Sequence, residues 1–391
     1  MEKYIPLSVP NFEGNEQKYV NDAVQQGWVS TGGAYVKEFE KKLAEYLHTD
    51  DVAVCQSGTA ALHLALISCR VMPGDMVIVP TLTFIAAVNP IKYQFATPVF
   101  MDCDDSLCID PKKVAKFCAE ECKLDGLVLK HKASGKIVKA IVVVHVFGNM
   151  ADMEAIMDIA EKYNLKVVED ATEALGTYYT TGRYSGKYAG TIGDYGAYSF
   201  NGNKIITTGG GGAITAKHVS DTEHIRYLST QAKDDGLFYI HNEVGYNYRM
   251  TNLQAALGVA QLELLPEFIA RKQKNYDVYC DLFKDCEYAK VMPFRTGVNS
   301  NKWFYSLFIN KTEGLFDMHD IINFLDTHRI GTRPIWGLVH NQRPYKNDVS
   351  YKIDKAIYYE KHILNIPCST NLVYQDILKV ADCVEKALYL E

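Results

Sequence analysis

The first half of the chain alternates short apolar runs with amphipathic stretches. Residues 75–80 (DMVIVP), 139–148 (KAIVVVHVFG) and 165–171 (LKVVEDA) are almost continuously apolar, as strands buried on both faces are. Residues 151–164 lie between the last two runs and carry apolar side chains at helical spacing. Because a strand, a helix and a second strand in this order form a crossover unit, the pattern predicts a mostly parallel α/β sheet flanked by helices.

The pattern changes after residue 250. Residues 252–283 are rich in helix formers and long enough to bridge two domains, although Pro266 is expected to bend or break the helix. Residues 302–309 (KWFYSLFI) and 317–329 (DMHDIINFLDTHR) then indicate a smaller α+β unit.

The chain, at 391 residues, exceeds the size at which a single hydrophobic core usually divides. We therefore expect a large domain over residues 1–250 and a smaller C-terminal domain over residues 251–391, joined by the long helix. Residues 122–139 interrupt the large domain with charged side chains and a Ser-Gly turn, which predicts a surface hairpin.

Composition limits the class of protein. A formal net charge of -6 leaves no excess of basic residues for binding nucleic acid. The ten cysteines form neither a C-x-x-C pair nor zinc-type spacing, and the N-terminus lacks the layout of a signal peptide, so we expect reduced thiols, no metal site and a cytoplasmic location. Because no run approaches about 18 apolar residues, we also expect no membrane-spanning helix.

The first candidate for chemistry is residues 56–66 (QSGTAALHLAL), where a Ser-Gly-Thr turn opens directly into an apolar helix. Backbone N–H groups and the positive end of the helix dipole meet there beside the hydroxyls of Ser57 and Thr59, so the turn could hold an anion such as phosphate. Serine and threonine before a helix are most often simple N-caps, and this segment alone leaves that alternative open.

The second candidate is the pair Asp170 and Glu173, which follow the end of the apolar run 165–171. In open α/β sheets ligands bind just beyond the carboxyl ends of the strands, so a carboxylate here faces the expected site and could keep a heterocyclic nitrogen protonated. The alternative is that Asp170 caps the next helix.

The third candidate is Lys204, within SFNGNKIITTGGGG (residues 199–212), between two segments with the composition of buried strands. Most lysines are exposed surface charges, but a desolvated lysine is a nucleophile that forms Schiff bases with carbonyl compounds. An anion-binding turn, a strand-end aspartate and a half-buried lysine together supply what pyridoxal phosphate requires.

At this point the sequence resembles the DegT/DnrJ/EryC1/StrS family, the fold-type I pyridoxal-phosphate aminotransferases that act on nucleotide-linked keto sugars. The resemblance covers essentially the whole chain and implies a mostly parallel central sheet flanked by helices, with a smaller C-terminal α+β domain. Eight motifs follow one another in family order: GWVSTGGAYVKEFE, SGTAALHLAL, VPTLTF, VVEDATEALG, YSFNGNK, GYNYRMTNLQAALG, TRPIWGLVHNQRPY and NIPCSTNL.

The resemblance also implies roles for individual residues. Lys204 would form the Schiff base with pyridoxal 5'-phosphate, and Asp170 would pair with its ring nitrogen. Glu173, where many relatives have Gln, would lie near the phenolic oxygen. The remaining contacts to this cofactor, from the phosphate to the ring face, would come from Gly58, Thr59, Ala60, Ser199 and Phe84.

The resemblance implies a homodimer with shared active sites, because Asn247 would reach the phosphate of the neighbouring subunit's cofactor. L-Glutamate would be the amino donor and would leave as 2-oxoglutarate. Lys204 would serve as the base in both half-reactions; related sugar dehydratases carry histidine at this position. The rival class is a regulatory protein with this fold and no turnover, which would lack Lys204 or Asp170, and this chain has both.

The motif SFNGNKIITT and the insertion at 122–139 most resemble those of one subgroup of the family. Its members aminate C4 of UDP-linked 2-acetamido-4-keto-2,6-dideoxyhexoses, on the route to bacillosamine or legionaminic acid. C3 amination and a GDP-linked, perosamine-type substrate are the alternatives. The candidate contacts to the sugar nucleotide are Trp28, Ser30, Thr31 and His340. For two of them another interpretation stays open: Trp28 is a core residue, or His340 has only a structural role in its loop.

Overall fold

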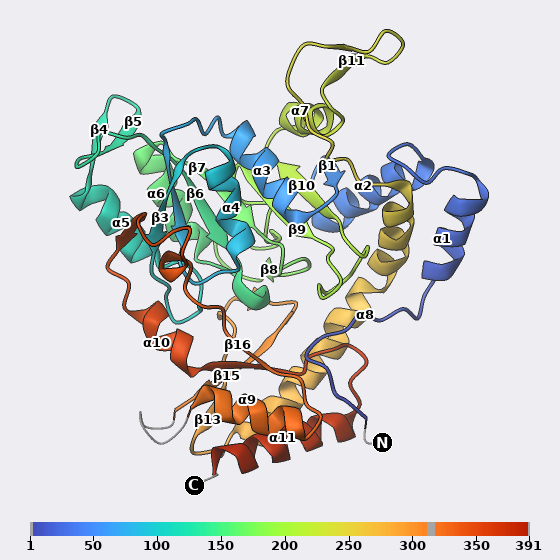
Figure 1. Ribbon diagram of the computed structural model, residues 1–391, viewed down its shortest axis with the longest axis vertical. Coiled ribbons are helices and arrows are strands. Elements are labelled where there is room, and N and C mark those ends of the chain that lie inside the picture. The colour runs from blue at the N-terminus through green and yellow to red at the C-terminus, as the bar shows by residue number, and fades with distance from the viewer. Residues whose placement is uncertain (1–2, 311–316, 390–391) are drawn as a thin grey trace.

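The computed structural model describes residues 3–310 and 317–389, and an eight-stranded sheet forms its centre (Figure 1). Neighbouring strands from β9 to β17 all pair in parallel, and β10 alone runs antiparallel to both of its neighbours. The mostly parallel sheet expected from the sequence is therefore confirmed. In spatial order its strands are β1 (Val52–Cys55), β10 (Gly212–Ala216), β9 (Tyr195–Ser199), β7 (Lys166–Asp170), β6 (Val138–Val144), β2 (Met76–Pro80), β3 (Thr97–Met101) and β17 (Val349–Tyr351).

The three apolar runs found in the sequence form the middle of this sheet, as β2, β6 and β7. The residues of β2 and β6 are buried except for one intermediate position, which explains why their polarity does not alternate. Helix α6 (Met153–Tyr163) joins β6 to β7 as the expected crossover. β6 ends at Val144, before the predicted limit of 148, because the chain turns through the 3-10 helix η2 (Val146–Gly148).

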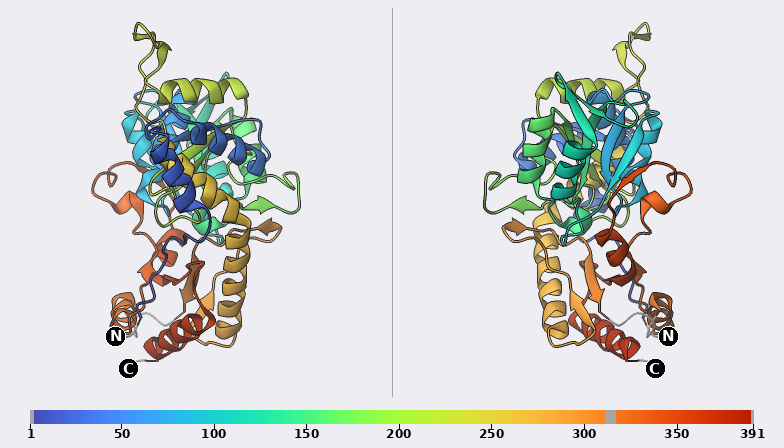
Figure 2. Two further views of the ribbon diagram at one scale, coloured as in Figure 1. Left: turned by 90° about the vertical axis from the view of Figure 1, so that its right-hand side faces the viewer. Right: turned by 90° about the vertical axis from the view of Figure 1, so that its left-hand side faces the viewer.

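Helices cover the sheet (Figures 1 and 2). α3 (Gly58–Ser68) is apolar on nearly every side because it lies between β9 and β10 and the helices α4 and α7. The other helical segments of this part of the chain are α1 (Glu16–Gln25), α2 (Ala34–Leu47), η1 (Ile85–Ala87), α4 (Asn89–Tyr93), α5 (Pro111–Glu120) and α7 (Val219–Ser229).

The long helix α8 (Asn252–Phe283) runs from the large sheet to the C-terminal unit. It continues through Pro266, and Figure 2 shows a change in the direction of its axis, so of the two expected outcomes the helix bends and does not break. Leu265 and Phe268 on either side of the proline are buried, and packing against α1, α2 and α11 stabilises the helix across the missing N–H group.

The same helix bears on the expectation about membrane spans. Within the described chain, α8 is long and apolar enough to cross a membrane by length and composition. Half of its most apolar window is buried inside the protein, so the apolar composition is explained by packing in the core.

A second, four-stranded antiparallel sheet lies at the other end of α8 (Figure 1). This α+β unit corresponds to the one indicated by residues 302–329. Its strands and helices are β13 (Ala289–Val291), β15 (Tyr305–Ile309), β18 (Ile363–Ile366), β16 (Arg333–Pro334), α9 (Met318–Thr327), α10 (Lys355–His362) and α11 (Tyr374–Leu388).

Three β pairings cross the proposed domain boundary at residue 250. Near the N-terminus, Ile5 pairs with Ile330 of the C-terminal unit, and β17 from the C-terminal part joins the edge of the large sheet. The short helix η3 (Val339–Asn341) precedes β17, and β8 (Tyr178–Tyr179) pairs with β14 (Val298–Asn299) across the same boundary. The division into domains at 1–250 and 251–391 stays a prediction. Segments from each side of residue 250 pair with segments from the other side.

Two hairpins extend from the large sheet. β4 (Cys122–Asp125) and β5 (Val128–His131) form the first, within the predicted stretch 122–139, although residues from 138 onward already belong to β6. The second, β11 (Lys233–Asp235) with β12 (Ile240–His241), projects well away from the body of the protein (Figures 1 and 2).

Candidate active site

A cavity of about 380 Å³ opens at the carboxyl end of β7, where the rule for open α/β sheets places a ligand. Segments far apart in the sequence meet here, among them the start of α3, the turn after β7 and the loop after β9. The sequence-predicted residues that line it are Gly58, Thr59, Phe84, Asp170, Glu173, Ser199 and Lys204.

The start of α3 forms one end of the cavity. Ser57 is the N-cap, and its hydroxyl accepts the N–H of Ala60 at 3.1 Å, so the capping interpretation of Ser57 is correct. This bond occupies the Ala60 N–H, and Ala60 is not among the residues that line the cavity. Of the expected phosphate contacts, Gly58, Thr59 and Ser199 remain at the cavity wall.

The fold brings the backbone unusually close together at this helix start. A Cβ atom added to Gly58 would lie 2.9 Å from Cβ of Ser199 and 2.9 Å from Cγ2 of Thr172. A Cβ atom on Gly212 would lie 2.7 Å from the Gly58 nitrogen. Glycine at both positions therefore keeps open a narrow cradle of N–H and hydroxyl groups, which suits a phosphate.

Asp170 is the last residue of β7 and is buried. Residues 171–177 form turns, so Asp170 does not cap a helix; its Oδ1 accepts the N–H of Thr172 at 3.1 Å. Burial raises the pKa of the Asp170 carboxyl, and this hydrogen bond and the positive charge of Lys204 oppose that rise. A carboxylate with this environment is suited to sharing a proton with a ring nitrogen.

The neighbouring Glu169 holds the strand end in place and was not singled out from the sequence. Its two oxygens accept N–H groups from Gly190, Ile192 and Gly193 and contact Nε2 of His145 at 2.9 Å. Both side chains are fully buried, and the His145 backbone N–H donates to the Asp170 carbonyl at 3.1 Å. This buried hydrogen-bond network at the end of β7 holds Asp170 in place at the cavity wall.

Lys204 reaches into the cavity, with its side chain only 13% exposed, so it is not an ordinary surface lysine. Its Nζ lies 3.6 Å from Oε1 of Glu173 and 4.0 Å from the centroid of the Trp303 ring. The ammonium group is thus flanked by a carboxylate and an aromatic face.

Glu173 is buried, and its Oε2 accepts the N–H of Phe147 at 2.8 Å. Phe147 donates from the left-handed region, with φ +55°, inside η2. Burial raises the pKa of the Glu173 carboxyl from 4.5 to about 7, although Lys204 acts in the opposite direction. This carboxyl group consequently exchanges its proton near neutral pH.

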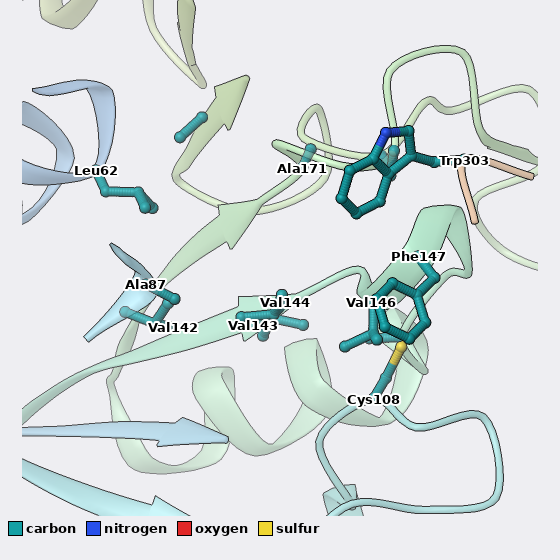
Figure 3. Close-up of a cluster of buried hydrophobic side chains, with 14 of the residues drawn as sticks. Leu62, Ala87, Cys108, Val142, Val143, Val144, Val146, Phe147, Ala171 and Trp303 are labelled. Atoms are coloured by element: carbon teal, nitrogen blue, oxygen red, sulfur yellow. The ribbon is translucent and has the colours of Figure 1, made fainter. Parts of the chain in front are cut away.

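Sequence reasoning missed the two tryptophans of the cavity, Trp303 and Trp336. Trp303 lies within the apolar segment 302–309, in the connection before β15, which begins at Tyr305. Figure 3 shows its indole beside Phe147 at one end of an apolar cluster that includes Val144. The sequence does not distinguish a tryptophan that lines a cavity from one that is buried in the core, because both occur next to apolar strand residues.

Comparison with known proteins identifies the family. The profile of the DegT/DnrJ/EryC1/StrS aminotransferase family matches residues 10–385. The chain belongs to this family. It is a pyridoxal-phosphate-dependent sugar aminotransferase.

Individual members of the family are similar over nearly the whole length. GDP-perosamine synthases of Escherichia coli O157:H7 and Caulobacter vibrioides are 34% and 35% identical to this chain, over 98% of it and 98% of each relative. A DegT/DnrJ/EryC1/StrS aminotransferase from Brucella abortus has the same fold, with a TM-score of 0.85, 25% identity and 96% of both chains covered.

The sugar aminotransferase site fits pyridoxal phosphate in this chain. Gly58 at the start of α3, Asp170 and Lys204 line one cavity, and Phe84 lies on its wall with 54% of its surface exposed. The residues present at the cavity therefore fit the cofactor that the family uses.

Other residues expected at the site lie outside this cavity. Trp28 is 60% exposed, so the alternative of a core role is wrong, and the loop of Trp28 and Ser30 is tied to Asn252 through backbone carbonyls. The Nδ1 atom of His340 is 2.6 Å from Oγ1 of Thr81, and His340 is not in the cavity lining.

Thr31 and Asn247 are also apart from Lys204. They line a second, open cavity of about 410 Å³ together with the base of the β11–β12 hairpin. Asn247 is exposed and does not line the cavity of Lys204 in its own chain.

Proposed function

We propose that this aminotransferase moves an amino group from L-glutamate to the C4 ketone of a nucleotide-linked 4-keto-6-deoxy sugar. The observation that carries this proposal is the cavity that Lys204, Glu173 and Asp170 line together beside the start of α3. The cavity supplies a nucleophilic amine, two carboxyl groups with raised pKa values and an anion cradle.

Each side chain has a distinct task. When bound, pyridoxal phosphate supplies the carbonyl that takes up the amino group and a ring that accepts electrons. Asp170 holds a proton at the ring nitrogen, and Lys204 removes a proton from the α-carbon of the amino donor. The same lysine delivers a proton in the reverse direction when the keto sugar is aminated.

The groups around these two residues bind and orient. The N–H groups of Gly58 and Thr59 and the hydroxyl of Ser199 hold the phosphate, while the Phe84 ring covers one face of the cofactor. Glu173 sits next to the Lys204 amine, where it can hold a proton at neutral pH. Val144 and Trp336 add apolar side chains to the lining of the cavity.

Two nucleotides are candidates for the sugar carrier. The motif SFNGNKIITT and the β4–β5 hairpin favour a UDP-linked 2-acetamido-4-keto-2,6-dideoxyhexose, a precursor of a bacterial surface-glycan amino sugar. The similarity to GDP-perosamine synthases over 98% of the chain favours a GDP-linked 4-keto sugar. Both candidates carry a 4-keto group on a nucleotide-linked sugar, and they differ in the nucleotide base and in the 2-acetamido group of the sugar.

The position of Asn247 supports a homodimer with shared active sites. Asn247 and Thr31 lie at the foot of a hairpin whose apolar tip residues Leu237, Phe238 and Tyr239 are each more than 70% exposed. Large apolar side chains gathered on a projecting arm suit burial against a second copy of the chain. Trp28 and Ser30 lie on an exposed loop, where a partner or the sugar nucleotide could contact them.

The structure describes all ten cysteines; none of them forms a disulfide and eight are buried, which supports placing the enzyme in the reducing cytoplasm.

The direct test uses the full-length enzyme loaded with pyridoxal phosphate. We expect a yellow protein that loses its colour with L-glutamate and that, after borohydride reduction, carries the cofactor on the Lys204 peptide. A panel of UDP- and GDP-linked 4-keto sugars, with the product amine located by NMR, then decides the substrate. A colourless protein that cannot be reconstituted with the cofactor would contradict the proposed function.

A further inference from the structure

The amine of Lys204 is enclosed from two sides. Glu173 Oε1 lies 3.6 Å away, and the Trp303 ring centroid lies 4.0 Å away. Trp303 comes from the C-terminal part of the chain, while Lys204 and Glu173 come from the loops of the large sheet. The contact with the indole therefore joins the two parts of the protein at the reacting lysine.

Trp303 is held by one hydrogen bond from its indole and two at its backbone. Its Nε1–H donates to the carbonyl of Asn203, the residue before Lys204, at 2.8 Å. The backbone N–H of Trp303 donates to Oδ1 of Asn301 at 2.9 Å, and the Trp303 carbonyl accepts from Nζ of Lys272 at 2.8 Å. Lys272 is itself buried, so the ring has little freedom to turn away.

Trp303 is a poor candidate for stacking on a sugar or a nucleobase. Phe304 stacks on it, with ring centroids 3.8 Å apart and planes 12° apart, and the Lys204 amine lies over the ring as well. Only 3% of Trp303 is exposed. The available aromatic surface is directed to the lysine rather than to an incoming ligand.

We propose that Trp303 is a positioning residue, whose indole holds the free amine of Lys204 in the cavity while the amino donor occupies the cofactor. This inference rests on the proposed role of Lys204 as the base. Lysine has four flexible carbons, and proton transfer requires the amine within hydrogen-bond reach of the proton it removes. An aromatic face attracts the ammonium form and restricts the stem, so it keeps the amine near the site between proton transfers.

The first test needs no cofactor and no turnover. In enzyme stripped of pyridoxal phosphate, acetylation of Lys204 by acetic anhydride is followed by mass spectrometry, with exposed Lys41 as the internal reference. We expect Trp303→Leu to be labelled at Lys204 at least about 3-fold faster than wild type, and Trp303→Phe to lie between them, because phenylalanine keeps a weaker aromatic face.

Trp336→Phe is the matched control, because Trp336 lines the same cavity and its ring contact is with Phe147. We expect its Lys204 labelling to equal that of wild type. Equal labelling in wild type and Trp303→Leu would overturn the inference, and so would an equal acceleration in Trp336→Phe. Thermal melting of each variant establishes that it is folded, and Trp303→Phe provides the comparison if Trp303→Leu is not.

The second test separates this inference from the proposed function. With cofactor and borohydride, Trp303→Leu should still be trapped on Lys204, while its single-turnover reaction with L-glutamate slows by at least about 10-fold. Trapping on a different residue in wild type would contradict the assignment of Lys204 itself. Trapping on Lys204 with a wild-type single-turnover rate in Trp303→Leu would contradict only the role of Trp303.

Discussion

The Oε1 atom of Glu173 lies 3.6 Å from Nζ of Lys204, inside a cavity that both residues share with Asp170. The buried carboxyl group has a pKa of about 7, against an ordinary value of 4.5. An acid that titrates next to the reacting amine makes both stability and activity depend on pH near neutrality.

The direction in which stability changes with pH follows from the proton that the Glu173 carboxyl group binds. Between about pH 4.5 and pH 7 the folded state retains the proton that the unfolded state loses, so its contribution to stability falls as pH rises. We expect this loss to total about 3 kcal/mol across the window and to be absent in Glu173→Gln. Urea denaturation of wild type and variant at a series of pH values measures it.

Glu45→Gln is the matched control, because that carboxylate is 63% exposed. It should follow the wild-type pH dependence of stability. If Glu173→Gln also follows wild type between pH 4.5 and pH 7, the carboxyl group does not carry a raised pKa.

Replacing Lys204 with alanine removes the amine and leaves the phosphate cradle intact. We expect Lys204→Ala to bind pyridoxal phosphate without a covalent link and to lose turnover by at least about 10³-fold. Dialysis retention and amino transfer from L-glutamate are the measurements, with exposed Lys41→Ala as control. Substantial remaining transamination would refute the assignment of Lys204 as the base.

A methyl group at Gly58 would fill the cradle beside Ser199 and Thr172. We expect Gly58→Ala to weaken binding of pyridoxal phosphate by at least about 10-fold and to destabilise the fold by about 1–3 kcal/mol. Gly236→Ala is the control, since a Cβ there meets nothing within 4 Å. Cofactor titration and thermal melting of both variants measure these effects; unchanged affinity in Gly58→Ala would argue against a phosphate at this helix start.

A shared site predicts complementation between two inactive subunits. Asn247→Ala should retain the cofactor poorly, and Lys204→Ala should not turn over. A random mixture of the two should recover about a quarter of wild-type activity, because half of the dimers are mixed and each contains one intact site. Activity after subunit exchange is the measurement, and no recovery in subunits shown to have exchanged would contradict the shared site.

The sequence by itself was sufficient to predict the central sheet. Runs such as 75–80 and 165–171 are apolar on both faces because helices cover both faces of a parallel sheet, and that pattern is local. Asp170 was predictable for a related reason, since a polar residue ending such a run lies at the sheet edge where ligands bind. The family motifs then connected it to Lys204.

The long helix shows where local rules leave two outcomes open. Pro266 weakens a helix in isolation, and the sequence predicted either a bend or a break there. Packing on both sides of the proline decided for a bend, since α8 bridges the two sheets and buries its apolar residues between them.

Only the tertiary structure decided what surrounds the reacting lysine. Trp303 follows Asn203 by 100 residues in the sequence, and Phe147 donates to Glu173 only because η2 turns its N–H toward that carboxyl group. The raised pKa of Glu173 comes from burial, which depends on every segment that closes the cavity. A sequence records which groups are present, and long-range packing determines their distances and their exposure to water, on which this chemistry depends.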